Sequence, residues 1–174
     1  PSGAVLGSVL LPRSGDPALI AFDGTNYLLV WNEPTTPPPD GPGIYGQLVS
    51  KQATAVGGTY RISQSTTLRE ADGVAFDGAR YLVVWSNTTG NPTLRNIYAR
   101  FVSTAGVPEG SDFDIDDGSG VDASLAFGAS RYLVAWNEDV NNTQTRARFV
   151  GTGGTLDTAF PVNDSAPASD RSGR

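Results

Sequence analysis

The sequence has no cysteine, no histidine and no methionine among its 174 residues. Without histidine and cysteine it cannot form a Ser-His-Asp triad, a thiol nucleophile, a zinc finger or a disulfide framework. These absences exclude the commonest hydrolytic, redox and zinc-dependent functions.

Positive charge is scarce as well. The chain has 12 basic and 18 acidic residues, a net charge of −6 and a pI of about 4.5. Nucleic-acid binding needs clustered positive charge, so we predict no nucleic-acid partner. The apolar runs, such as Tyr27 to Trp31, have the length of a strand and fall far short of the ~20 residues of a membrane helix. We therefore predict no membrane insertion.

The missing cysteine and methionine fit an oxidising environment, where thiols and thioethers do not last. This favours an extracellular or cell-surface location. The sequence shows no signal peptide. We expect that one was removed, or that the chain is part of a longer protein.

A repeated block dominates the sequence. The segments 21–31, 75–85 and 126–136 share the order Ala-Phe, a short turn, Tyr-Leu and a closing tryptophan. Those tryptophans, Trp31, Trp85 and Trp136, follow one another at intervals of 54 and 51 residues. A second block follows each tryptophan at 44–50, 97–103 and 145–150, and a third at 60–62, 113–115 and 160–162.

Each repeat predicts four short strands. The first ends in Ala-Phe and leads into an Asp-Gly turn, which favours a tight hairpin. The second is apolar throughout, which indicates burial on both faces. The fourth alternates, so we expect Phe113 and Ile115 to point inward while Asp112, Asp114 and Asp116 face water. No segment shows a sustained helical period.

Four-stranded antiparallel units of about fifty residues are typical of β-propeller blades. We therefore predict an all-β chain of propeller-type blades. The expected parts are the fourth strand of an incomplete blade at 1–12, blades at 18–63, 71–116 and 122–163, and a loop or tail at 164–174. The alternative is a β-trefoil, which also has three four-stranded repeats.

The pattern Ala-Phe-Asp-Gly-x-x-Tyr-Leu-Val-Val-Trp, followed by Ile-Tyr-x-x-x-Val-Ser, resembles tandem repeats of bacterial secreted and cell-surface proteins. The resemblance covers nearly the whole chain. It implies a β-propeller and no shared catalytic motif. The third repeat departs from the pattern, because Gly128 replaces the turn aspartate and Thr145-Arg146 replaces Ile-Tyr.

Three blades are too few to close a ring, since propellers use about four to eight. Three outcomes are open: two chains form a six-bladed ring, a longer chain supplies the remaining blades, or chains add end to end as a fibre. We expect self-association or further blades in each case.

The acidic stretch Asp112, Asp114, Asp116 and Asp117 is a candidate for a calcium site, because spaced carboxylates supply hard oxygen ligands. A solvated strand face explains the same alternation. We expect no other cofactor.

Glu33 and Glu138 hold equivalent positions after the second strand, each preceded by asparagine (Asn32, Asn137). Two carboxylates can serve glycoside hydrolysis, but these belong to different repeats. We therefore predict no enzyme activity and favour a non-catalytic structural or interaction module. The alternative is a lectin-like propeller that binds a glycan through these four residues.

Overall fold

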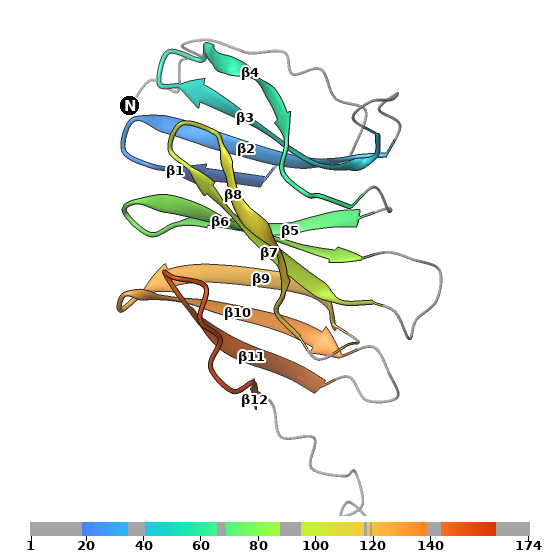
Figure 1. Ribbon diagram of the computed structural model, residues 1–174. Coiled ribbons are helices and arrows are strands. Elements are labelled where there is room, and N and C mark those ends of the chain that lie inside the picture. The colour runs from blue at the N-terminus through green and yellow to red at the C-terminus, as the bar shows by residue number, and fades with distance from the viewer. Residues whose placement is uncertain are drawn as a thin grey trace, which may run out of the picture.

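Three separate four-stranded antiparallel sheets follow one another along the chain (Figure 1). They come from a computed structural model, which describes residues 19–34, 41–65, 69–87, 95–116, 118, 120–138 and 144–162. In each sheet the strands lie side by side in chain order. Within those ranges every regular element is a strand, and no helix is long and apolar enough to cross a membrane.

The strand bounds are as follows. The first sheet contains β1 (Leu19–Phe22), β2 (Asn26–Glu33), β3 (Gly43–Ser50) and β4 (Ala55–Arg61). The second contains β5 (Arg69–Phe76), β6 (Arg80–Asn87), β7 (Ile97–Ser103) and β8 (Pro108–Asp114). The third contains β9 (Gly120–Gly128), β10 (Arg131–Glu138), β11 (Gln144–Gly151) and β12 (Phe160–Pro161).

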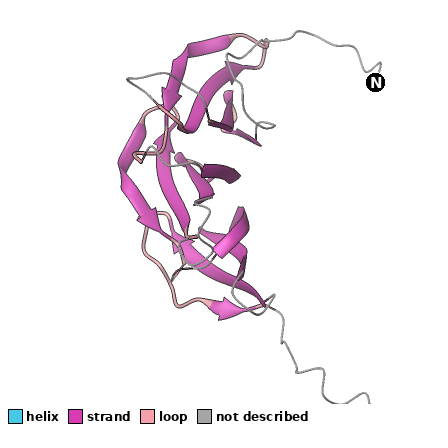
Figure 2. Cartoon of the chain, turned by 90° about the vertical axis from the view of Figure 1, so that its right-hand side faces the viewer, coloured by secondary structure: helices cyan, strands magenta, loops and turns pink. Residues whose placement is uncertain are grey.

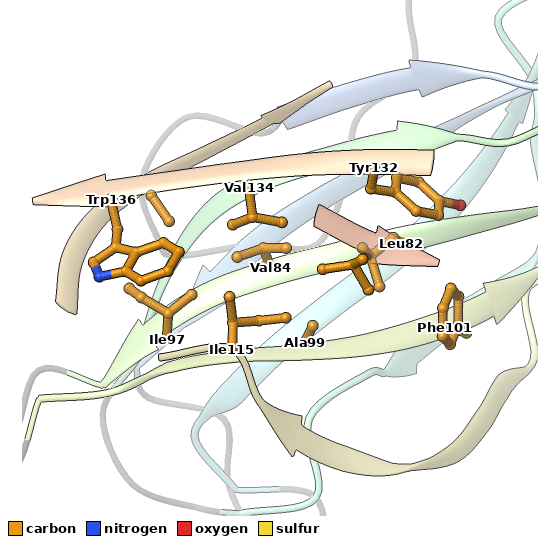
Figure 3. Close-up of a cluster of buried hydrophobic side chains, with 11 residues drawn as sticks. Leu82, Val84, Ile97, Ala99, Phe101, Ile115, Tyr132, Val134 and Trp136 are labelled. Carbon is orange, nitrogen blue, oxygen red and sulfur yellow. The ribbon is translucent and has the colours of Figure 1, made fainter. Parts of the chain in front are cut away.

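The sheets stack face to face, and β6 shows why its sequence is apolar throughout. Leu82 and Val84 point into the core shared with the third sheet. Tyr81, Val83 and Trp85 point into the core shared with the first sheet. Figure 3 shows the first of these cores, where Leu82 and Val84 lie near Tyr132, Val134 and Trp136 of β10. The prediction that the second strand is buried on both faces is therefore confirmed for β6. It is wrong for β10, where Leu133 on the far face is 37% exposed because no further sheet of the described residues covers that face.

The sheets fan out from one side. Neighbouring sheets approach most closely along their first strands, β1 beside β5 and β5 beside β9. A stack that is closer on one side than on the other must curve, and Figure 2 shows the three sheets following an arc. These are propeller-type blades, as predicted, and the β-trefoil alternative is wrong because the sheets do not close into one shared barrel.

The first two hairpins share a turn that the sequence predicts. Oδ1 of Asp23 accepts hydrogen bonds from the backbone N–H groups of Thr25 and Asn26, both at 2.7 Å. Asp77 does the same for Ala79 and Arg80, both at 2.8 Å. The glycine after each aspartate has a positive φ of 97° or 100°. In each turn the aspartate therefore accepts hydrogen bonds from two backbone N–H groups. The residue in the left-handed conformation is a glycine, which has no Cβ to strain it.

The third hairpin lacks both features. Gly128 stands where the aspartate was, and Ala129 adopts a φ of 49° at the position of the turn glycine. A left-handed conformation costs a residue with a Cβ roughly 1–2 kcal/mol.

We therefore expect Ala129→Gly to raise the free energy of unfolding by about 0.5–1 kcal/mol, the relief of strain less the extra chain entropy of glycine. Urea denaturation measures the change. The matched control is the reverse substitution, Gly78→Ala, which puts a Cβ at a φ of 100° in open space and should destabilise by a similar amount. A loss of stability in Ala129→Gly would refute the strain.

The fourth strands differ from the prediction at two aspartates. The side chain of Asp112 is only 12% exposed instead of facing water, because it lies 3.8 Å from the guanidinium of Arg100 and accepts a hydrogen bond from the N–H of Gln64 at 2.9 Å. Ile115 is buried and Asp114 is exposed, as expected. Asp116, however, is buried instead of facing water, because its carboxylate accepts hydrogen bonds from the N–H groups of Ile97 at 2.8 Å and Gly120 at 2.6 Å. The chain leaves the strand after Asp114, so alternation no longer decides where Asp116 points. The predicted strand at 1–12 and the tail at 164–174 lie outside the described residues.

Candidate functional site

The second and third sheets each donate a tyrosine hydrogen bond to the sheet before them. The hydroxyl of Tyr81 donates to the carbonyl of Asn26 at 3.4 Å, and that of Tyr132 donates to the carbonyl of Arg80 at 3.3 Å. Burial raises the pKa of both phenols well above the ordinary value, and the nearby turn aspartates, Asp23 and Asp77, raise it further. Both hydroxyls therefore stay protonated and serve as donors across the contact between neighbouring sheets, which we call the joint.

The surface that receives Tyr132 is an aromatic stack on the second sheet. The guanidinium of Arg80 lies 3.8 Å from the ring centre of Phe101, and the rings of Phe101 and Phe113 are 5.8 Å apart. The ring of Tyr132 lies 6.2 Å from that of Phe101. Arg80 also pairs with Glu109 at 2.9 Å. Cation–π contact and the ion pair hold this stack in place for the third sheet.

The third sheet carries a second example of this stack on its opposite face. Arg131 lies 4.1 Å from the ring centre of Phe149, and the rings of Phe149 and Phe160 are 5.9 Å apart. Arg131 pairs with Asp157 at 2.9 Å, as Arg80 does with Glu109. Here, however, no further sheet of the described residues covers the stack.

We call this surface the trailing flank and define it by Leu133, Phe149, Phe160 and Val162. In the strand register these residues correspond to Leu82, Phe101, Phe113 and Ile115 of the second sheet. Leu82 and Ile115 are 0% exposed, whereas Leu133 is 37% and Val162 58% exposed. The same apolar positions that are covered in the second sheet are therefore open in the third.

The first sheet has the complementary open surface, which we call the leading flank and define by Ile20, Phe22 and Tyr27. The rings of Phe22 and Tyr27 pack 4.6 Å apart, like the pair Phe76–Tyr81 of the next sheet at 5.1 Å. Tyr81 is 0% exposed and Tyr27 is 38% exposed. Tyr27, Tyr81 and Tyr132 hold the same position in the three repeats. Among the described residues, only Tyr27 has no neighbouring sheet to cover it.

A cluster of three carboxylates lies between the first strands of the second and third sheets. Asp72 sits in an irregularity of β5 between Ala71 and Gly73, with Glu70 on the same strand and Asp122 on β9. The pKa of Asp72 is raised to about 7, mainly by burial and also by the negative charges of Glu70 and Asp122, against the hydrogen bonds of Ser86, which lower it. Oδ2 of Asp72 is buried without a hydrogen-bond partner among the described residues.

A shallow hollow of about 350 Å³ opens between the second and third sheets, beside the aromatic stack. Arg80, Glu109 and Phe101 line it together with Gly153 and Gly154 of the third sheet. Arg80 and Glu109 are already paired with each other, so neither offers a free charge to a ligand in the hollow.

The calcium candidates do not converge. The Asp112 carboxylate accepts a hydrogen bond from the N–H of Gln64 at 2.9 Å, and Asp116 accepts two backbone bonds at the start of β9. Asp114 is exposed, and Asp117 lies outside the described residues. Within the described ranges no three carboxylates are grouped as metal ligands.

The glycan or glycosidase candidates lie on different sheets. Glu33 is buried in the first sheet, beside Asn32. Glu138 pairs with Arg146 at 2.9 Å in the third sheet, where Asn137 accepts a hydrogen bond from Thr145 at 3.2 Å. The whole second sheet stands between the two glutamates, so the structure does not bring them together.

Sequence reasoning missed the arginine of the aromatic stack and the carboxylate cluster. A signal for the first was present, since Arg80 and Arg131 both directly precede the repeated tyrosine. No comparable pattern marks Asp72, because its burial depends on the irregularity in β5.

The comparisons with known proteins point to the fold. The sequence matches no protein-family model and none of the curated proteins. The structure is similar to "A subtype N10 neuraminidase-like protein of A/little yellow-shouldered bat/Guatemala/060/2010", with a TM-score of 0.52 and 15% identity over 88% of this chain and 46% of that one. It is also similar to a neuraminidase-like protein from A/bat/Guatemala/164/2009, with a TM-score of 0.51 and 16% identity over 87% of this chain and 44% of that one.

At this identity the likeness concerns the fold alone. It agrees with blades of the propeller type, as found in the three sheets. The chain spans less than half the length of either neuraminidase-like chain.

Proposed function

We propose that this chain is a non-catalytic structural and interaction module of the cell exterior, a set of propeller blades whose two flanks are covered by further blades. One observation carries the proposal. The trailing flank repeats the covered surface of the second sheet position by position, including the arginine over the phenylalanine, yet it stands open.

Open apolar surfaces of this kind are a liability for a chain that works alone. Contiguous exposed apolar patches mark interaction sites or promote aggregation. Fully burying a side chain such as Leu133 or Phe160 stabilises by roughly 1.5–3 kcal/mol. A partner that covers both flanks therefore stabilises the blades and keeps their surfaces from non-specific contacts.

The positions of the acidic residues support a role without catalysis. Glu138 is engaged by Arg146, and Glu33 is buried a full sheet away from it. A glycosidase needs its two carboxyl groups on either side of one bond, about 5–10 Å apart. The exterior location is proposed from the missing cysteine and methionine and from the resemblance to secreted repeats.

A tandem chain tests the proposal. We expect a polypeptide that carries residues 1–174 twice to unfold at a midpoint on the order of 5–10 °C above that of the single copy, because each copy covers the flanks of the other. Scanning calorimetry at a concentration that keeps single copies apart measures the difference. The matched control is the same tandem chain with Leu133→Asp in both copies, which should lose the gain. Equal midpoints for the single and tandem chains would refute the need for further blades.

A further inference from the structure

We infer that the occupant of each flank is a second copy of this chain, so that two copies close one ring with the leading flank of each on the trailing flank of the other. The inference rests on the proposed function and names its partner. It concerns two identical contacts between different surfaces, related by the twofold axis of the pair.

The chain contains two joints between neighbouring sheets. The leading flank corresponds to one side of such a joint and the trailing flank to the other side. In the joint between the second and third sheets, the pair Phe127–Tyr132 fits beside the stack of Arg80, Phe101 and Phe113. The leading flank offers the pair Phe22–Tyr27, and the trailing flank offers the stack of Arg131, Phe149 and Phe160.

The polar contact of the joint is also reproduced. Tyr132 donates its hydroxyl hydrogen bond to the carbonyl of Arg80, the residue that carries the guanidinium of the stack. In the proposed contact Tyr27 of one copy donates to the carbonyl of Arg131 of the other. The turn aspartate near this bond is missing, because Gly128 replaces it. The contact between copies therefore lacks one polar group that both joints within the chain possess.

The curvature of the stack favours a closed ring of blades. The three sheets already follow an arc because they approach most closely along their first strands (Figure 2). Repeating the same joint continues the same arc.

Residues of β2 and β3 limit how much of the leading flank is open. Trp31, Tyr45 and Val49, which lie on the same face as Tyr27, are already buried within the single chain. The open part of the leading flank is therefore confined to β1 and the start of β2. These are the strands nearest the side on which the sheets converge, which is where the two internal joints are closest.

The mass of native particles tests the inference. For the full chain at about 50 µM we expect particles of twice the chain mass of 18.2 kDa by light scattering or native mass spectrometry. Ile20→Asp on the leading flank and Leu133→Asp on the trailing flank should each shift the population to single chains, with at least a tenfold weaker dissociation constant. Val107→Asp is the matched control, because Val107 is 57% exposed and lies in the hairpin between β7 and β8, away from both flanks.

Mixing the two variants separates this arrangement from other dimers. A copy with Ile20→Asp keeps its trailing flank, and a copy with Leu133→Asp keeps its leading flank. Together they should form mixed pairs through one intact contact, although neither variant pairs with itself. A dimer in which like flanks meet would survive one of the two substitutions and would overturn the inference. Near-ultraviolet circular dichroism of each variant confirms that it is folded.

Two further results would contradict the closed pair. Wild-type chains that stay single at 50 µM would remove the second copy as partner. A ladder of species larger than two chains would show flank contacts that do not close. If the tandem chain gains stability while free copies stay single, the inference fails and the proposed function stands. If neither happens, both fail.

Discussion

Replacing Tyr81 by alanine should lower the free energy of unfolding by about 3–5 kcal/mol, the range found for large aromatic residues removed from a core. Tyr81 is fully buried between the first two sheets, packs against Phe76 at 5.1 Å and donates a hydrogen bond across the joint. The substitution leaves a cavity and removes the hydrogen bond across the joint, although the carbonyl of Asn26 keeps the bond from the N–H of Asp23 at 3.1 Å. Urea denaturation followed by tryptophan fluorescence measures the loss.

The repeat supplies the control for this prediction. Tyr27 holds the same position in the first sheet and packs on Phe22, but it is 38% exposed on the leading flank. At a concentration where chains are single, Tyr27→Ala should cost only about 1 kcal/mol, since much of its surface is already in water. Equal losses for the two substitutions would show that the joint contributes little and that both tyrosines stabilise only their own sheet.

The contrast between these two tyrosines also shows what the sequence can reveal. The pattern predicts the four strands of each unit, the burial of β6 on both faces and the Asp-Gly turns. It does so because these features depend on neighbours close in the chain, and because three similar units repeat the same signal. The sequence cannot show that Tyr27 is open while Tyr81 is covered, since the two segments read almost alike.

Asp116 and Asp72 mark a second limit. Alternation along β8 predicted that Asp116 faces water, yet the chain turns after Asp114 and carries the carboxylate to the N–H groups of Ile97 and Gly120. Asp72 lies at an irregularity in β5, and no local sequence motif predicts that irregularity. Both cases depend on where the backbone leaves regular strand geometry, and the period of a strand holds only while that geometry lasts.

We expect the carboxylate cluster to make the free energy of unfolding fall as pH rises. The pKa of Asp72 is raised to about 7 in the folded chain from an ordinary value of 3.8, with burial as the largest cause. The folded state therefore holds a proton that the unfolded state has already released between those two values. Stability linked to this group is complete below about pH 4, declines through neutrality and is lost above pH 7.

Asp72→Asn should remove that dependence, because the amide keeps the shape of the protonated carboxyl and never ionises. We expect the variant to be more stable than the wild type by on the order of 2–4 kcal/mol at pH 8 and to differ little at pH 4.5, as the raised pKa implies. Urea midpoints at the two pH values test this. Asp114→Asn changes the net charge equally at an exposed position of β8 and serves as the control. A wild-type chain that is no less stable at pH 8 than at pH 4.5 would mean that Asp72 reaches water or a cation and is not held as a buried acid beside Glu70 and Asp122.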